Sequence, residues 1–303
     1  DPNPMPHDYL KGVYNITPTP FHPDGSLDEA SLKTLTRFNI DKGVDGMTIL
    51  GVMGETAKVT DAERDRIIAG VIEAANGELP ICVGASHGGT DGCVARSKRA
   101  QELGAKAVMV APPQLARSNE EAMYRHYMTV AEAIDIPVVV QDHPASTKVY
   151  MSVDLIVRIA ETAPRCNFLK LEDVPCPPKV AAVRKAKPDM VIFGGLGGMM
   201  FLEELKSGAD GTMTGFGFPD ILVDIHRKFF SGDIDGATET FYRYCPLIRF
   251  EAQEGISMPL RKEIYARRGA IASAQARRPY PALDEGTLRD LDDLLTRLEL
   301  QGK

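Results

Sequence analysis

The sequence predicts an α/β fold, a (β/α)8 TIM barrel with a C-terminal three-helix appendage. Eight short apolar runs follow one another between residues 12 and 231, and an amphipathic segment follows each run. Strands that alternate with helices form a parallel sheet, and eight such units in a row are typical of a closed barrel. A doubly wound open sheet is the alternative, but no GxGxxG motif follows the first run, which disfavours it.

Each apolar run has the length and composition of a strand that is buried on both faces. The predicted strands are Val13–Thr17, Asp45–Leu50, Pro80–Ala85, Ala107–Ala111, Pro137–Asp142, Asn167–Leu171, Met190–Gly194 and Gly211–Thr214. The predicted helices are 27–43, 61–76, 90–104, 119–134, 152–162, 175–187, 197–207 and 219–231. Polar caps precede acids at Thr60 and Asn119, and glycines stand where three helices are expected to end, at Gly43, Gly104 and Gly208.

Three regions are predicted along the chain. Residues 1–11 are expected to be a disordered leader, because they are rich in proline and lack the basic and apolar parts of a signal peptide. Residues 12–231 form the barrel, which carries the catalytic site. Residues 232–303 form the C-terminal helical region, in which Pro279 and Pro281 mark a loop before a last helix over Thr287–Leu298.

Composition narrows the class of protein. The net charge of −7, from 35 Lys and Arg against 42 Asp and Glu, offers no basic surface for nucleic acid or an anionic membrane. No apolar stretch approaches the roughly 18–20 residues that span a bilayer. The five cysteines are odd in number and lack CxxC spacing, so we expect them to be reduced and the protein to be cytoplasmic.

Lys170 is the residue that most strongly suggests chemistry. It lies within the predicted strand Asn167–Leu171, where alternation places Phe168, Lys170 and Glu172 on one face. A lysine in a buried strand is costly unless it is paired or used for chemistry. A desolvated lysine can attack a carbonyl carbon and form an imine. From these residues alone, Lys170 is either a Schiff-base lysine or the structural ion-pair partner of Glu172.

The carboxyl ends of barrel strands are where the chemistry of this fold gathers. The turn Gly51-Val52-Met53-Gly54-Glu55 follows the second predicted strand, and its free backbone N–H groups could cradle a carboxylate. The alternative is a tight turn and nothing more. Gly195, Thr214 and Gly215 follow or end the last two strands, where we favour close approach of a substrate over phosphate binding.

Taken in order, these segments resemble the dihydrodipicolinate synthase/N-acetylneuraminate lyase family of class I aldolases and dehydratases. The similarity covers Gly12 to Phe21, the GxxGE turn Gly51–Glu55 and the segment Phe168-Leu169-Lys170. It implies that Lys170 forms an imine with a 2-oxo acid and that Gly51, Val52, Met53, Gly54 and Glu55 hold the substrate carboxylate. It also implies a homo-oligomer, a dimer or a homotetramer, that needs no cofactor beyond the covalent lysine imine.

The sequence departs from the family members that make dihydrodipicolinate. Gln141 stands where the family pattern has a proton-relay tyrosine, and Ser146 stands where it has an arginine that grips the aldehyde substrate. Pro113 and Gln114 stand where the family pattern has a pair of tyrosines after the fourth strand. Val52 and Met53 stand where it has two threonines in the glycine turn. Because glutamine has no titratable proton, the tyrosine relay cannot operate unchanged.

Gln141-Asp142-His143-Pro144-Ala145-Ser146 and Gly211 to Pro219 instead resemble the branch that dehydrates 2-keto-3-deoxy sugar acids such as L-2-keto-3-deoxyarabonate. Gly54-Glu55 keeps the general family pattern more closely than that branch is expected to. In a dehydratase, Glu172 would remove a C3 proton once the imine has formed, although it could equally be an ion-pair partner of Lys170. Ser146 is either a substrate contact or a turn residue.

Several alternatives stay open at this stage. The same lysine could support aldol cleavage, 4-hydroxy-tetrahydrodipicolinate synthesis or, in a non-catalytic relative, mere binding of a 2-oxo acid. His87 and His143 lie near strand ends, but no HxH or HExxH spacing supports a metal site, so we expect none.

Overall fold

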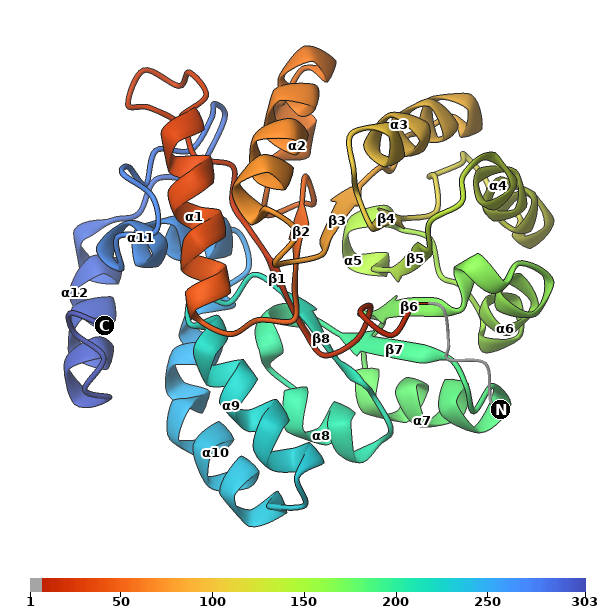
Figure 1. Cartoon of the computed structure of the whole chain (residues 1–303). Helices are drawn as coiled ribbons and strands as arrows, with labels where there is room; N and C mark the ends of the chain where they lie inside the picture. The colour runs from red at the N-terminus through yellow and green to blue at the C-terminus, as the bar shows by residue number, and fades with distance from the viewer. Residues whose placement is uncertain (1–6) are drawn as a thin grey trace.

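The computed structural model describes residues 7–303 and confirms the predicted barrel (Figure 1). Eight parallel strands pair in sequence order, and β8 closes the barrel onto β1. The strands are β1 (Val13–Ile16), β2 (Gly46–Ile49), β3 (Ile81–Gly84), β4 (Ala107–Val110), β5 (Val138–Asp142), β6 (Phe168–Leu171), β7 (Val191–Gly194) and β8 (Gly211–Thr214). Each observed strand lies within the predicted run, which was longer by at most a few residues.

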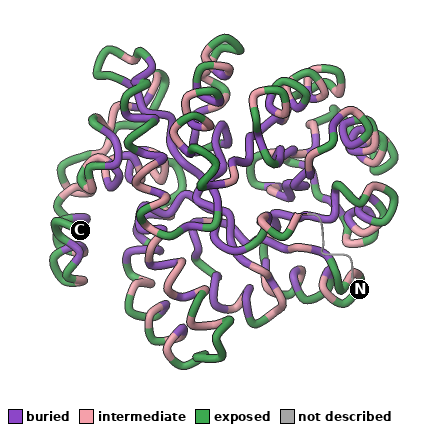
Figure 2. The backbone as a smooth tube through the Cα atoms, viewed as in Figure 1, coloured by how far each residue is buried: buried purple, intermediate pink, exposed green. Residues whose placement is uncertain are grey.

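Alternation along the strands separates two cores. Tyr14, Met109, Phe168 and Phe193 belong to a buried cluster made mostly of strand residues, which fills the inside of the barrel. The neighbouring strand residues, such as Leu169, pack with helix residues in the larger outer core. In Figure 2 the strands are accordingly buried, whereas the helices expose their outer faces. The two faces of each strand therefore serve different layers, as the period of two requires.

The predicted helices are all present, with the ends that the local sequence favours. The barrel helices are α1 (Glu29–Asp41), α2 (Asp61–Ala75), α3 (Thr90–Glu102), α4 (Glu120–Ala133), α6 (Val153–Thr162), α7 (Cys176–Ala186), α8 (Phe201–Lys206) and α9 (Pro219–Phe230). Thr60 and Glu63 form a capping box at the start of α2, and Asn119 caps α4. Gly43, Gly104 and Gly208 have positive φ just beyond helix ends, as predicted.

Helix α8 is shorter than the predicted 197–207. Gly197 and Gly198 adopt φ values of 69° and 83°, which an α-helix cannot contain, so a short 3₁₀ turn (η3, Leu196–Gly198) precedes the helix. Three other short elements were not predicted: the 3₁₀ turns η1 (Thr56–Lys58) and η2 (Pro164–Cys166), and α5 (Pro144–Thr147), which begins at a proline.

The beginning of the chain differs from the predicted leader. Residues 1–6 lie outside the described residues. Residues 7–10 form a turn in which Leu10 is buried, and the Tyr9 hydroxyl donates to the backbone oxygen of Lys106. Packing against the barrel therefore begins before residue 12, because Leu10 joins the inner cluster of the barrel.

Three helices follow the barrel: α10 (Ile234–Glu251), α11 (Ser257–Arg267) and α12 (Glu285–Arg297). Helix α10 packs along α9, α11 lies beside α1, and α12 packs against α10 at the outer edge of the molecule (Figure 1). The Tyr265 hydroxyl donates to Asn15 Oδ1 (3.0 Å), which ties α11 to the first strand. Within residues 7–303, no helix is long and apolar enough to cross a membrane.

Candidate active site

Lys170 lies on β6 and points into the barrel. Its position in the ladder is opposite Gln141 of β5 on one side and Phe193 of β7 on the other. Lys170 is 5% exposed and Gln141 is 6% exposed. The pleat that places Phe168 in the inner cluster also turns Lys170 inward, as the sequence predicted. The amine and the amide therefore share one region at the carboxyl end of the barrel.

Glu172 is the direct partner of Lys170. Its Oε1 lies 2.8 Å from Lys170 Nζ, and the backbone N–H of Leu196 donates to its Oε2 (2.9 Å). Burial by itself would raise the pKa of Glu172, but the positive charge of Lys170, with a smaller effect of His143 and these hydrogen bonds, outweighs it and lowers the pKa. The carboxylate is thus held in its charged form, which a proton acceptor requires.

Gly195 makes room for that carboxylate. A Cβ atom at Gly195 would lie 2.6 Å from Glu172 Cδ, closer than real atoms approach. The predicted role of Gly195 was direct approach to substrate, whereas its immediate neighbour in the structure is the Glu172 side chain. A side chain at this position would displace Glu172 from Lys170.

Asp142 and its partners support the site from outside. Lys179 of α7, which the sequence analysis did not single out, donates to Asp142 Oδ2 (2.7 Å) and Asp173 Oδ2 (2.8 Å). Burial raises the pKa of Asp142 to about 6, although Lys179 opposes the shift. This bridge fixes the ends of β5 and β6 relative to each other, next to Gln141 and Lys170. In the sequence, the only indication of this role was that Lys179 follows two prolines at the start of α7, close after Asp173.

Ser146 and His143 lie together at the rim. Ser146 is exposed on α5, and its Oγ lies 2.7 Å from His143 Nδ1. Burial lowers the pKa of His143, against the opposing effect of Glu172. His143 therefore faces the charged pair, and Ser146 is a neighbour of His143.

The glycine turn is divided between the site and the protein interior. Val52 is 65% exposed, whereas Met53 is 4% exposed and belongs to the inner cluster. Gly51 lies against Ile16 and Met109, and a Cβ at Gly54 would come within 3.0 Å of the Leu50 backbone. The turn is therefore tight, and its second glycine is required by packing.

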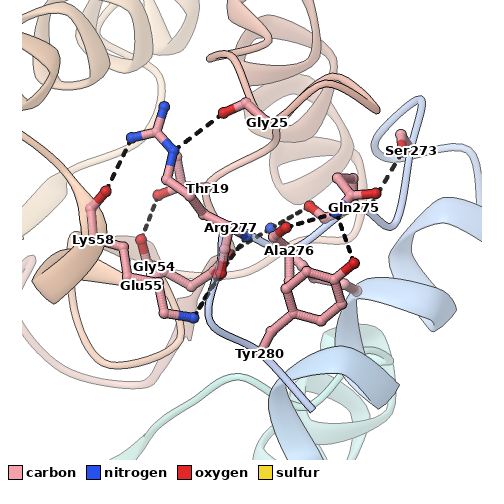
Figure 3. A network of polar contacts seen from close by, with 11 residues as sticks. Thr19, Gly25, Gly54, Glu55, Lys58, Ser273, Gln275, Ala276, Arg277 and Tyr280 are labelled. Carbon is pink, nitrogen blue, oxygen red and sulfur yellow. Dashed lines mark hydrogen bonds and ion pairs between the residues drawn. The ribbon is translucent and has the colours of Figure 1, made fainter. Parts of the chain in front are cut away.

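Glu55 faces away from the lysine. Its Oε2 accepts from Lys262 Nζ (2.6 Å), and its Oε1 accepts from Lys58 Nζ (3.2 Å) and from the Arg277 backbone N–H (2.9 Å). Figure 3 shows this carboxylate turned toward the C-terminal segment that carries Gln275 and Arg277. Direct contact of Glu55 with a substrate carboxylate, as predicted, does not fit this geometry, because its two oxygens already accept from three protein donors and its charge would repel an anion.

Thr214 and Gly215 lie at the end of β8, next to the glycine turn. Thr214 is buried at the end of β8. A Cβ at Gly215 would lie 3.1 Å from both the Ile16 oxygen and Met53 Cγ. The end of β8 thus lies against the buried residue of the glycine turn, so these two predicted regions do meet.

No metal centre emerges among residues 7–303: these contain no group of three or more His, Cys, Asp or Glu side chains placed to hold a metal ion. His87, one of the two histidines weighed as a ligand, accepts a hydrogen bond from the Gly89 backbone. A cavity of about 840 Å³ opens at the other end of the barrel, beside Leu10, Phe168 and Asp210, and does not include the lysine, Glu172 or Gln141.

Comparisons with known proteins show what this chain is similar to. The sequence profile of the Dihydrodipicolinate synthetase family matches residues 9–298. An L-2-keto-3-deoxyarabonate dehydratase of Azospirillum brasilense is 35% identical over 295 residues, 95% of this chain and 94% of that protein. A 4-hydroxy-tetrahydrodipicolinate synthase of Thermotoga neapolitana is 28% identical over 247 residues, 79% of this chain and 83% of that protein.

A solved structure gives the same result in three dimensions. The crystal structure of a dihydrodipicolinate synthase from Rhodopseudomonas palustris has a TM-score of 0.90 and 33% identity, and the match covers 95% of this chain and 98% of that one. With a profile that spans nearly the whole chain, the chain belongs to the dihydrodipicolinate synthetase family.

Proposed function

We propose that the protein is a Schiff-base lyase that dehydrates a 2-keto-3-deoxy sugar acid. The observation that carries the proposal is the buried Lys170–Glu172 pair, 2.8 Å apart, with Gln141 beside Lys170 in the ladder. Membership of this lyase family and the named function of the Azospirillum relative support it. An amine, a carboxylate and a neutral amide meet the needs of dehydration without a relay tyrosine.

The chemistry would begin at C2 of the substrate. The Lys170 ammonium passes one proton to the carbonyl oxygen, its amine attacks C2, and the oxygen leaves as water with a second amine proton to give the protonated imine. The imine acidifies the C3 hydrogens, and the Glu172 carboxylate takes one of them. The electron pair of that C–H bond forms the C3–C4 double bond as the C4 hydroxyl leaves. The proton held by Glu172 goes to this hydroxyl, which departs as water, and hydrolysis of the imine returns free Lys170.

The other residues would bind and orient the substrate. Gln141 can donate and accept hydrogen bonds but cannot exchange a proton, which suits it to hold a hydroxyl. Backbone N–H groups of Gly51, Val52 and Met53 are offered to the substrate carboxylate, whereas the Gly54 N–H already donates to the Gly51 oxygen (3.1 Å) and would only shape the turn. Ser146 would act at the rim with His143. No cofactor is needed in this scheme, since the lysine imine itself withdraws the electrons.

A product screen tests the proposal. Purified protein is supplied with 2-keto-3-deoxy sugar acids, and the products are identified by mass spectrometry. A product lighter than its substrate by one water supports dehydration, whereas pyruvate and an aldehyde would show aldol cleavage. If sodium borohydride and pyruvate leave the protein unlabelled, the non-catalytic alternative is favoured.

A 4-hydroxy-tetrahydrodipicolinate synthase is the second candidate, because several relatives carry that name. Ser146 cannot give the charged, bidentate grip that arginine gives a carboxylate, and Gln141 cannot relay a proton. We therefore expect condensation of pyruvate with aspartate semialdehyde well below the roughly 1–1000 per second that is typical of enzymes. Turnover within that range would overturn the preference for the dehydratase.

We also propose a homo-oligomer, a dimer or tetramer, in the cytoplasm. The five cysteines among the described residues are free, and four of them are buried, which fits a reducing compartment. One related structure is that of a monomeric dihydrodipicolinate synthase variant, so assembly varies among relatives. Light scattering coupled to gel filtration measures the oligomer size, and cell fractionation measures the location.

A further inference from the structure

Two adjacent glycines at the end of β7 have a carboxyl group packed against each of them. Gly194 faces Glu204 of α8: a Cβ there would lie 1.5 Å from Glu204 Oε2. Gly195 faces Glu172, whose Cδ would lie 2.6 Å from its Cβ. Successive residues of an extended strand point to opposite sides, so the two acids lie on opposite sides of one strand end. The missing side chains are what allow both acids to come so close to the backbone.

Glu204 is buried without a proper partner. It is 1% exposed, and neither carboxyl oxygen makes a hydrogen bond of normal geometry with any described residue. The Gly195 N–H lies toward it and offsets part of the burial cost. An ionised carboxylate in such a place would be expensive, so the group stays protonated instead. Burial, with the nearby charges of Glu172 and Glu203, raises the pKa of Glu204 to about 8.

The charges around Glu204 come from three elements and are mainly acidic. Glu172 follows β6, Glu203 is on the same helix, and the Cys176 thiol lies on α7. Beyond Cys176 lie Asp142 and Asp173, which share Lys179. Lys170, the cation beside Glu172, is paired with that carboxylate. Among residues 7–303, Glu204 has no ion pair, and its neighbouring charges only raise its pKa.

We propose that Glu204 is a positioning residue that acts through Glu172. It remains a neutral carboxylic acid on the other side of the β7 end from Glu172. Its ionisation at alkaline pH weakens binding of the 2-oxo acid. While Glu204 is neutral, the Lys170–Glu172 pair has no net charge and admits an anionic substrate. Once Glu204 ionises, a second negative charge lies behind the site. Linkage makes the effect reciprocal, so bound 2-oxo acid raises the pKa of Glu204. The effect on substrate rests on the proposed function, whereas the neutral acid does not.

Infrared difference spectroscopy between pH 7 and pH 9 tests the neutral acid in the whole protein. A carbonyl band of a protonated carboxylic acid should be lost as the pH rises through about 8. The band should be absent in Glu204→Gln and in Glu204→Met, and it should persist in Glu203→Gln, the control on the same helix, with a lower midpoint because one acidic neighbour of Glu204 is gone. Glu204→Met removes the acid without burying an unpaired amide, so it serves if the glutamine variant does not fold. A wild-type spectrum without the band would overturn the proposal.

Steady-state kinetics then test the coupling to substrate. In the wild type, KM should rise between pH 7 and pH 9, by about tenfold if the interaction is worth one pKa unit. In both Glu204 variants KM should change less than in the Glu203→Gln control, while kcat at pH 7 stays within a few-fold of wild type. Pyruvate should also move the midpoint of the infrared band upward. Identical pH profiles for wild type and the Glu204 variants would overturn the coupling. If pyruvate is never trapped on Lys170, the proposed function fails, and the infrared result still decides whether Glu204 is neutral.

Discussion

Among residues 7–303, two buried lysine–glutamate pairs differ in where they lie and in how they are bonded. Lys170 and Glu172 are two residues apart at the end of β6, 2.8 Å from each other inside the barrel. Lys262 and Glu55 are far apart in sequence, and their atoms lie 2.6 Å from each other between α11 and the glycine turn. The first pair lies at the carboxyl ends of the barrel strands. The second joins the C-terminal region to the barrel.

The two pairs differ in how completely their hydrogen bonds are satisfied. Glu55 accepts from three donors, and Lys262 also donates to the Gln275 oxygen (2.9 Å) and lies over the Phe21 ring, 4.5 Å from its centre. Within the described residues, Glu172 Oε1 has the ion pair with Lys170 but no hydrogen bond of normal geometry. An incomplete set of partners leaves Glu172 able to take a proton.

Basicity alone would point to Lys262 as a nucleophile. Burial lowers the pKa of Lys262 to about 8 although Glu55 opposes the shift, so its amine is easier to deprotonate than an ordinary lysine. Lys262 is nevertheless completely buried, and its protons are already donated to Glu55 and Gln275. A nucleophile needs space for a carbonyl carbon as well as a free electron pair. Access therefore favours Lys170, which is 5% exposed, over Lys262, which is 0% exposed.

The first way to break this comparison is to ask which lysine reacts. Treatment with pyruvate and borohydride should add a reduced pyruvyl group to the peptide that holds Lys170, because that amine lies at the carboxyl ends of the strands and, unlike Lys262, is not completely buried. Lys170→Ala should reduce the label to background, the largest effect we expect. Peptide mass spectrometry locates the label. A label on Lys262, or on the exposed Lys148 or partly buried Lys58, would show that access does not decide the reaction.

Glu172→Gln tests the carboxylate of the same pair. The variant should still form the imine, but kcat should fall about 10²–10⁴-fold, because a general base contributes that much. Exchange of the C3 hydrogens of pyruvate in deuterated water reports the step directly. Asp173→Asn is the matched control, since Asp173 is the next acid but pairs with Lys179. Normal exchange in Glu172→Gln would leave Glu172 only as an ion-pair partner of Lys170.

The buried structural pair should respond in stability rather than in chemistry. Lys262→Met leaves Glu55 without its shortest contact in a buried place, and loss of one partner from a buried pair costs about 3–5 kcal/mol in free energy of unfolding. Urea denaturation measures the change. Lys11→Met, in an exposed pair with Asp8, is the control and should have little effect. Pyruvate trapping on Lys170 should persist in the folded Lys262→Met protein; its loss would mean that the two pairs are not independent.

The sequence was sufficient to predict the local features of the molecule. The barrel, the inward face of Lys170 and the cap at Thr60 follow from alternation and capping, which depend on neighbours in sequence. The direction of Glu55 does not, because its partners Lys262 and Arg277 come from distant segments. The same is true of Glu204, whose contact with Gly194 requires knowledge of how α8 packs on β7. Contacts between distant elements were the part that the sequence alone could not give.

The Arg277–Glu63 ion pair, next to the Lys262–Glu55 pair, should give the smallest change in stability and the one that depends most on pH. Arg277, whose backbone N–H binds Glu55, also forms a two-pronged contact with Glu63, Nη1 to Oε1 at 2.8 Å and Nη2 to Oε2 at 2.6 Å. The hydrogen bonds from Arg277 lower the pKa of Glu63 from 4.5 to about 2, although partial burial opposes them. A carboxyl whose pKa is lower in the folded state stabilises the fold above its unfolded value and loses that contribution as the pH falls. The Glu63 contribution should therefore be complete above about pH 5 and vanish on acidification toward pH 2.

Glu63→Gln should lower the free energy of unfolding at pH 7 by about 1 kcal/mol, since both side chains are partly exposed and water screens the pair. The difference from wild type should shrink as the pH approaches 2, where the wild-type carboxyl is also neutral. Glu29→Gln, which breaks an ion pair with Arg66 on the open surface, should have a smaller effect. Thermal unfolding of the three proteins between pH 2 and pH 7 measures these changes. A loss at pH 7 as large as that of Lys262→Met would place Glu63 within the buried network rather than at its edge. A loss that did not depend on pH would assign the effect to packing instead of charge.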